Sequence, residues 1–298
     1  MCRAWRECLA RCHRDGRVAV LTLKGGQLRT LGTRRSASSG GGFESEGAAG
    51  PTRPMRARGR RFRIAFRVAK ILLAIAGVLA AAVGLLFALT PSAGQATALA
   101  QAQAQARHIA YPGPPVPQNF AQALIATEDH RFNTDPGVDP LAMGRVVVSW
   151  ITGRKDQGGS TIDQQLAKNL YTGGRSGFTR DLEQLALAVK LNQAYSRAEI
   201  LRLYAEVAYY GHGYYGLEAA SCGYFGRPPD RLTLVQAAML AGVVNAPTYD
   251  DPLVYPHQAR TRLLHVIGRM TAVGYLTQAQ EIAALNASLG LSAVRGCP

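Results

Sequence analysis

A run of 19 uncharged, mostly apolar residues at positions 71–89 restricts the fold of this chain more than any other feature. At a rise of about 1.5 Å per residue, a helix of that length spans the ~30 Å hydrocarbon core of a bilayer. Residues 53–70 carry eight Lys or Arg residues and no acid, and such basic segments stay in the cytoplasm. We therefore predict a single-pass plasma-membrane protein whose N-terminus is cytoplasmic and whose later part is extracytoplasmic. The alternative is a buried helix of a soluble domain.

The distribution of charge argues against binding to nucleic acid. The chain has a net charge of +15, but 17 Lys or Arg and only 4 Asp or Glu residues lie within residues 1–70, so the remainder is close to neutral. A cationic cluster directly before an apolar span indicates membrane orientation. Residues 1–52 are Arg-rich and then Gly/Ser-rich with little periodicity, which predicts a disordered cytoplasmic segment.

After the apolar span, the sequence pattern predicts one mainly α domain. Residues 90–110 are polar and Ala-rich and are expected to form a small helix or a stalk. The Pro-rich residues 111–117 mark the start of a domain at 111–298. Apolar residues recur at helical spacing, and glycine clusters separate the periodic segments. The predicted helices are 119–128, 140–153, 161–171, 179–194, 197–209, 232–243 and 256–273.

Cysteines give weak constraints. Cys8, Cys12 and His13 resemble half of a metal site, but no second half is present in the sequence. Cys222 and Cys297 can pair in an oxidising compartment, although no spacing requires it.

The first motif, IATEDHRFNTDPG at residues 125–137, places acids where an apolar helix ends. The run before Glu128 and Asp129 is apolar, and Phe132 and a Pro-Gly turn follow. Burial of a carboxyl group raises its pKa and suits it to accept a proton near neutral pH. The alternative is an acid at the end of a helix on a solvated surface.

The second motif, QGGSTIDQQLAKN at residues 157–169, predicts a ligand-binding helix N-terminus. Two glycines let the backbone approach a ligand, and Ser160 or Thr161 caps the helix. Free N–H groups in the first turn suit an anionic or sugar ligand. Gln164 and Lys168 are four residues apart and share a face. An ordinary capped helix with a solvated face is the alternative.

Together these motifs resemble the first two signature motifs of family 51 glycosyltransferases, the peptidoglycan glycosyltransferase domains of class A penicillin-binding proteins and monofunctional transglycosylases. The resemblance continues in collinear order over about residues 111–285, through AEILRLYAEVAYYGHGYYGLEAAS (198–221), YFGR (224–227) and LTLVQAAMLAGVVNAPTYDDP (232–252). It implies a mainly α, lysozyme-like domain. No S-x-x-K, S-x-N and K-T-G set follows, so the chain resembles the monofunctional members.

The resemblance also implies roles for particular residues. It assigns the general base to Glu128 and pyrophosphate contacts to Lys168 and Arg180. Glu183 and Gln184 are the candidates for the position of a second catalytic glutamate. The other residues expected to bind substrate are Asp129, Phe132, Gly159, Ser160, Thr161, Gln164, Gln165 and Asn169.

Several positions depart from the family pattern. Asp135 stands where the family usually has His, Asp163 where it has Thr, and Glu206 where it has Asn. In the third motif the family's Lys falls on Asp181 and its second Glu on Gln184. Glu183 is one residue early, which rotates it by about 100° around the helix. Added carboxylates disfavour an anionic pyrophosphate unless a divalent metal bridges them.

The implied function is an inverting peptidoglycan glycosyltransferase that polymerises lipid II into β-1,4 glycan and releases undecaprenyl pyrophosphate. The expected partners are lipid II, the growing glycan strand, the membrane and other cell-wall synthesis proteins, and nucleic acid is not expected. The sequence requires no cofactor, and a divalent metal, Mg or Mn, is an option at the pyrophosphate. Two alternatives stay open: a degenerate scaffold that binds lipid II or glycan, and a lysozyme-like enzyme that cleaves glycan.

Overall fold

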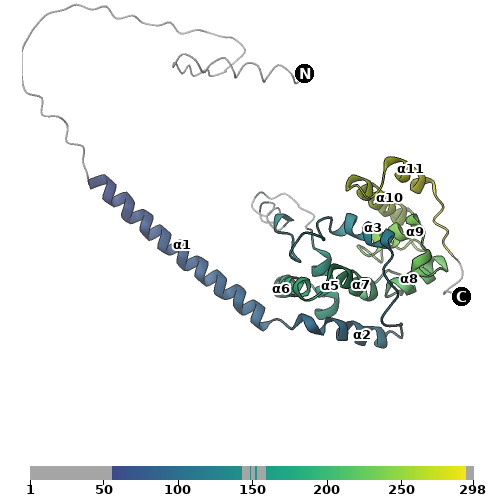
Figure 1. The fold of residues 1–298 in the computed structure, drawn as a ribbon, viewed down its shortest axis with the longest axis horizontal. Coiled ribbons are helices and arrows are strands. Elements are labelled where there is room, and N and C mark those ends of the chain that lie inside the picture. Colours follow the sequence, from purple (N-terminus) through teal and green to yellow (C-terminus); the bar gives the residue numbers. More distant parts are fainter. Residues whose placement is uncertain (1–55, 143–147, 149–151, 153–158, 293–298) are drawn as a thin grey trace, which may run out of the picture. The chain divides into compact units, whose positions relative to one another are not determined.

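The computed structural model describes residues 56–142, 148, 152 and 159–292. The described residues contain no β-strand, and one isolated bridge joins Tyr209 and Tyr215. The prediction of a mainly α chain is therefore confirmed. The elements in chain order are α1 (Arg56–Leu89), η1 (Ala93–Gln95), α2 (Ala96–Ala106), α3 (Gln118–Glu128), α5 (Ile162–Tyr171), α6 (Phe178–Ala194), α7 (Arg197–Val207), α8 (Leu217–Phe225), η2 (Pro229–Arg231), α9 (Leu234–Val243), α10 (Pro256–Ala272) and α11 (Gln278–Asn286) (Figure 1).

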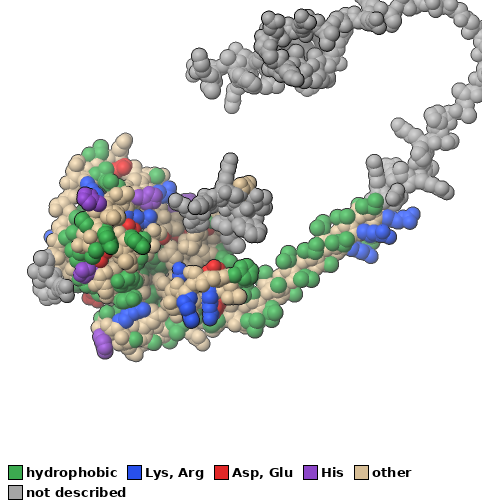
Figure 2. Space-filling view, turned by 180° about the vertical axis from the view of Figure 1, so that it is seen from behind, with side chains coloured by type: hydrophobic (Ala, Val, Ile, Leu, Met, Phe, Trp, Pro, Cys, Tyr) green, Lys and Arg blue, Asp and Glu red, His purple; other side chains and the backbone are tan. Residues whose placement is uncertain are grey.

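Helix α1 is 34 residues long and contains the apolar run at residues 71–89. The basic residues from Arg56 to Lys70 contain no proline and lie within this helix. Figure 2 shows apolar side chains along α1 and Lys and Arg side chains gathered towards its N-terminal end. Among the described residues, α1 has the length and the apolar composition that crossing a membrane requires. The expected disorder of residues 1–52 lies outside the described residues.

Helix α2 packs within the folded domain, whereas the sequence suggested a small helix or stalk at residues 90–110 that precedes the domain. Ala96, Ala100 and Ala104 are four residues apart and buried. They form a stripe of small side chains along which α2 packs against α5 and α7. The sequence did not reveal this stripe, because alanine contributes little to an apolar pattern and polar Gln residues lie between the alanines.

The centre of the domain is α9, in which every residue from Val235 to Val243 is buried. It packs against α3 and α10, while α5 packs against α6 and α7 (Figure 1). Two further helices, α8 and α11, were not predicted from the sequence. Cys222 on α8 is disulfide-bonded, and Cys297 lies outside the described residues. The helix predicted at 140–153 lies largely outside them as well.

The loop between α3 and α5 is held to the domain at Gly137. This residue has φ +90, and a Cβ added to it would meet the Ala188 carbonyl oxygen at 2.5 Å. Its own carbonyl oxygen accepts a hydrogen bond of 2.7 Å from Thr161 Oγ1. The loop therefore passes close to α6 at a position where only glycine fits without strain.

We expect Gly137→Ala to lower the free energy of unfolding by about 2 kcal/mol or more, because left-handed strain and a backbone clash act together. Gly173→Ala is the matched control, since Gly173 has φ +58 and open space around it. It should cost only about 1 kcal/mol. Denaturant unfolding of both variants measures the difference, and equal losses would show that the contact with Ala188 relaxes.

Candidate active site

A cavity of about 730 Å³ lies where α3 ends, beside α5, α6 and α10. Its walls come from segments far apart in the sequence. The lining residues are Thr127, Glu128, Gly159, Ser160, Gln164, Gln165, Lys168, Asn169, Ser176, Asp181, Gln184, Leu185, Tyr204, Ala208, Tyr209, Val244, Asn245, Pro247, Arg262 and His265.

Glu128 is the last residue of α3, and two donors from other helices fix its carboxylate. Its Oε2 accepts a hydrogen bond of 3.0 Å from Gln165 Nε2 on α5. Its Oε1 accepts one of 2.6 Å from Arg262 Nη2 on α10, and the Glu128 side chain is 6% exposed. A carboxylate oxygen has two lone pairs, and each of these two oxygens uses one in these bonds. Each oxygen can therefore accept a further hydrogen bond from a molecule in the cavity.

The orientation of Gln165 is set by Tyr204 on α7. The Tyr204 hydroxyl donates a hydrogen bond of 2.8 Å to Gln165 Oε1, which turns the amide nitrogen towards Glu128. Burial raises the pKa of Tyr204 well above its ordinary value, and the charge of Glu128 adds to this. The hydroxyl consequently stays protonated and remains a donor. Three helices thus determine the position of one carboxylate.

The start of α5 forms the second side of the cavity. Thr161 caps this helix, and its hydroxyl accepts from the backbone N–H of Gln164 while the Gln164 side chain accepts from the N–H of Thr161. The pattern predicted Ser160 or Thr161 as the cap, and the structure selects Thr161. Ser160 and Lys168 both line the cavity, and Lys168 places a cation one turn after Gln164.

Four of the predicted substrate-binding residues are not among those that line the cavity. Asp129 is buried and accepts a hydrogen bond of 3.2 Å from the backbone N–H of Ile162. Phe132 is buried in the core. Thr161 caps α5 from a buried position, and Arg180 pairs with Glu183. The first two differ from expectation because α3 ends at Glu128 and the chain turns at Asp129, which has φ −156 and ψ 75.

The third motif divides between the cavity and its surroundings. Arg180 Nη1 and Glu183 Oε2 form an ion pair of 2.8 Å, and neither residue lines the cavity. Gln184 lines it, but the Gln184 amide donates to Thr172 Oγ1 at 3.0 Å and to the Arg175 carbonyl at 2.9 Å. These two hydrogen bonds connect Gln184 to the turn that follows α5. The acid of this motif that lines the cavity is Asp181.

Sequence reasoning missed three of the polar residues in the cavity: Tyr204, Arg262 and His265. Arg262 is 134 residues from Glu128, so no local spacing connects them. Burial, and then the charges of Arg262 and Arg269, hold the pKa of His265 below its ordinary value. His265 is consequently neutral near pH 7 and can both donate and accept a hydrogen bond. Glu206, by contrast, lies outside the cavity and accepts from the backbone N–H of Gly113.

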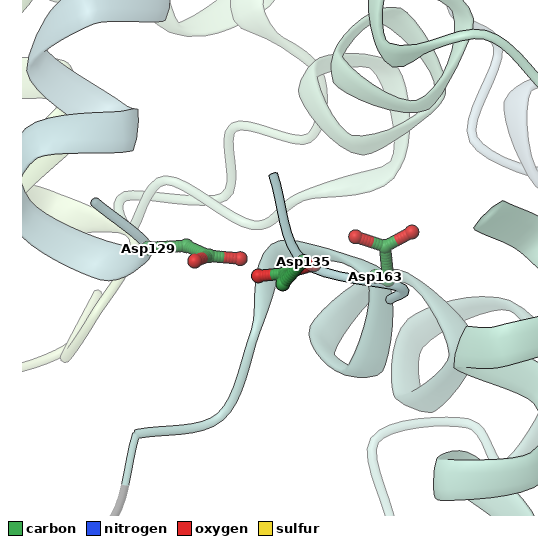
Figure 3. A group of neighbouring side chains, drawn as sticks. All are labelled: Asp129, Asp135 and Asp163. Carbon is green, nitrogen blue, oxygen red and sulfur yellow. The ribbon is translucent and has the colours of Figure 1, made fainter. Parts of the chain in front are cut away.

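Three buried aspartates lie close together at the start of α5: Asp129, Asp135 and Asp163 (Figure 3). Burial, and then the negative charge of Asp135, raises the pKa of Asp129 to about 7. Burial likewise raises the pKa of Asp163 to about 6. These carboxyl groups face the protein interior and do not line the cavity.

Residues 95–271, more than half of the chain, match the sequence profile of the transglycosylase family. The chain belongs to this family. The resemblance inferred from the two motifs is thereby confirmed, and the mainly α, lysozyme-like fold class agrees with it.

Individual relatives give the same result. The chain is 36% identical over 177 residues to penicillin-binding protein 1F of Bacillus subtilis, covering 59% of this chain and 25% of that protein. It is 39% identical over 166 residues to penicillin-binding protein 1A of Escherichia coli, covering 55% and 20%. A Cupriavidus necator protein named as a transglycosylase is 35% identical over 176 residues, covering 59% and 76%. The chain thus spans about a quarter or less of the two penicillin-binding proteins.

Proposed function

We propose that this transglycosylase is a membrane-anchored peptidoglycan glycosyltransferase that polymerises lipid II, with Glu128 as the general base. The observation that carries the proposal is the placement of the Glu128 carboxylate. It lies in the cavity with Ser160, Gln164 and Lys168 of the second motif, and Gln165 and Arg262 fix its position. A base held by rigid elements meets the geometric demand of proton transfer.

The chemistry requires one base and one site for negative charge. The 4-hydroxyl oxygen of the acceptor sugar forms a bond to the anomeric carbon of the donor, and the hydroxyl proton passes to Glu128. The bond from the anomeric carbon to the pyrophosphate oxygen breaks, and its electron pair leaves with undecaprenyl pyrophosphate. Attack from the face opposite the leaving group inverts the anomeric centre. Lys168 is the residue proposed to hold the departing charge.

The leaving pyrophosphate explains why one carboxyl group suffices. It is a stable anion, so no acid has to protonate it, and charge stabilisation replaces acid catalysis. Arg180, which the resemblance also assigned to the pyrophosphate, is paired with Glu183. Of the two cationic side chains that the resemblance assigned to the pyrophosphate, we therefore give the charge-holding role to Lys168.

We also propose that the cavity takes a divalent metal together with the pyrophosphate. Mg²⁺ prefers one or two carboxylates plus substrate phosphate oxygens, and Asp181 supplies such a carboxylate at the cavity wall. A bound metal would neutralise charge on the leaving group. Asn169 lines the same cavity and offers an amide oxygen.

Substitution of Asp181 by Asn tests this assignment. We expect Asp181→Asn to lower polymerisation about tenfold or more in saturating Mg²⁺, because a metal ligand is lost. In EDTA the same change should raise the residual rate, since the carboxylate then only repels the pyrophosphate. Glu183→Gln removes the same charge two residues away and should change both rates less than about twofold. Equal effects of the two substitutions would contradict a specific role of Asp181.

The decisive experiment incubates the purified full-length chain with labelled lipid II, and separately with preformed glycan. Formation of polymer from lipid II supports the proposal. Binding of lipid II without product indicates an inactive scaffold, the alternative raised by Gln184 at the position of the family's second glutamate. Shortening of glycan indicates a hydrolase. Both of these outcomes contradict the proposed activity.

The membrane orientation has its own test. Residues 53–70 are strongly basic and precede the apolar part of α1, so we expect the N-terminus to stay in the cytoplasm. A reporter fused after Pro298 should then be active only outside the cytoplasm. Cytoplasmic activity would contradict use of lipid II, because the domain would face the wrong side of the membrane.

A further inference from the structure

Three acidic side chains from separate segments of the sequence lie close together in the protein interior, and none of them lines the cavity. Asp129 follows the end of α3, Asp135 belongs to the loop after it, and Asp163 lies in the first turn of α5 (Figure 3). One carboxylate oxygen from each lies within 4.8 Å of the others. Their exposed fractions are 6%, 6% and 0%.

The protein leaves part of this charge without a counter-charge. Arg197 lies 3.6 Å from Asp163 Oδ2 and donates a hydrogen bond to the backbone oxygen of Asp135. Arg131, which is also in the α3–α5 loop, is paired with Asp139. One guanidinium facing three carboxylates leaves two buried negative charges if all three are ionised. Buried charge without a partner is strongly unfavourable.

Individual oxygen atoms show the same deficit. Asp129 Oδ2 accepts from Ile162 N–H at 3.2 Å, and Asp135 Oδ1 accepts from Gly137 N–H at 3.0 Å. Asp135 Oδ2 and Asp163 Oδ2 are buried and accept no hydrogen bond from any described residue. A buried carboxylate oxygen normally has a donor, but the side chain that faces Asp135 is the carboxyl group of Asp129. Two facing carboxyl groups require either a shared proton or a cation between them, and a cation is the only one of the two that also joins Asp163.

The donor set identifies the class of that group. Carboxylate oxygens are hard donors that bind Ca²⁺ and Mg²⁺. Oxygens on opposite sides of Ca²⁺ are about 4.6–5.2 Å apart, against about 4.2 Å for Mg²⁺. Separations of at most 4.8 Å are within reach of Ca²⁺, whereas Mg²⁺ gives up its bound waters reluctantly and suits a buried site less well. A divalent cation also supplies two positive charges, which balance the two negative charges that Arg197 leaves uncompensated when all three aspartates are ionised.

We propose that Asp129, Asp135 and Asp163 form a structural divalent-cation site that favours an ion of the size of Ca²⁺. The site joins the loop that follows Glu128 to the first turn of α5. The cation thereby sets the spacing between the two motifs that face each other across the cavity. It is separate from the pyrophosphate, and it does not depend on the proposed function.

Two of the three proposed ligands depart from the pattern that the family resemblance implies. Asp135 and Asp163 replace the His and Thr that the family resemblance leads one to expect. The two replacements lie 28 positions apart in the sequence and meet in space at Asp129. Substitution of these two residues is therefore a direct way to remove the site, and asparagine keeps the shape of both side chains.

The test uses the full-length chain, treated with EDTA and then titrated with CaCl₂, MgCl₂ or MnCl₂ at constant ionic strength. Thermal unfolding and calorimetric titration are the measurements. We expect Ca²⁺ in about hundredfold excess over its Kd to raise the unfolding temperature by roughly 5 °C, and one ion to bind per chain. Mg²⁺ should give a smaller shift.

The double variant Asp135→Asn, Asp163→Asn should bind Ca²⁺ at least about tenfold more weakly and lose the thermal shift. In EDTA it should unfold at a higher temperature than the natural chain, because two buried charges are gone. Asp230→Asn, a change at an exposed acid, should keep the shift of the natural chain. If the double variant does not fold, the single variant Asp163→Asn and the metal content of the purified natural chain test the proposed site instead.

Two outcomes would overturn the proposal. The first is a natural chain whose unfolding temperature no tested cation changes. The second is a cation-dependent shift that persists in the aspartate variants, which would place the ion elsewhere, for example in the cavity beside Asp181.

Discussion

Glu128→Gln is expected to reduce lipid II polymerisation by about 10²–10⁴-fold, the usual loss when a general base is removed. The glutamine keeps the shape of the side chain and can still accept from Arg262 Nη2, which lies 2.6 Å from Oε1. An amide cannot take the proton of the acceptor hydroxyl. The measurement is the rate of polymer formation at saturating lipid II, which reports the chemical step.

The structure offers a control for this substitution. Glu218 is an exposed acid at the start of α8, and Glu218→Gln should leave the rate within about twofold of the natural chain. Binding of lipid II to the Glu128→Gln variant should change little, because the loss is in the chemical step. A variant that keeps more than a tenth of the natural rate would place the base elsewhere.

Some helix starts carry a local signal in the sequence, although α3 and α6 were predicted within one residue without a side-chain cap. Predicted 161–171 became Ile162–Tyr171 because Thr161 and Gln164 form a capping box. Helix α11 carries the same T-x-x-Q signal, with Thr277 and Gln280 forming its capping box. It was therefore recoverable from the sequence. Helix α8 is flanked by Gly216 and Gly226 and has no capping side chain, so no capping box marked its start in the sequence.

The candidate site divides along the same line. Glu128, Gln164 and Lys168 were found because each stands at a helix end or at helical spacing, and the structure places all three in one cavity. Their chemical roles remain predictions. Phe132 was assigned to substrate from its place in the motif, yet it packs in the core with the Arg197 guanidinium 4.9 Å from its ring centre. Neighbouring positions in a loop motif carry no information about which side chain faces a cavity.

Arg262 shows what sequence reasoning cannot reach. It touches the proposed base, yet it lies 134 residues away, within a helix whose pattern is that of an ordinary amphipathic surface. Its partner becomes visible only when α3 and α10 pack together. The same is true of the three buried aspartates, whose departures from the family pattern looked unrelated until the fold joined them.

Arg262→Met is expected to lower both stability and activity by large amounts. The side chains of Arg262 and Glu128 are 17% and 6% exposed, and breaking a buried pair by removing one partner typically costs about 3–5 kcal/mol. The Gly242 carbonyl loses a donor as well, since Arg262 Nε lies 3.1 Å from it. Denaturant unfolding measures the stability, and the split between kcat and KM measures the activity.

The activity should fall mainly in kcat, because Arg262 positions the Glu128 carboxylate and is not the proton acceptor. Arg262→Lys should restore part of the rate, since an ammonium group can still donate to Glu128 Oε1 but not to Gly242 at the same time. Arg260→Met is the matched control on α10: Arg260 is exposed and donates to the Leu285 carbonyl, away from the cavity. It should cost less than about 1 kcal/mol and leave kcat unchanged. If Arg262→Met changes KM alone, Arg262 binds substrate directly, and the positioning role argued from its 2.6 Å contact with Glu128 is wrong.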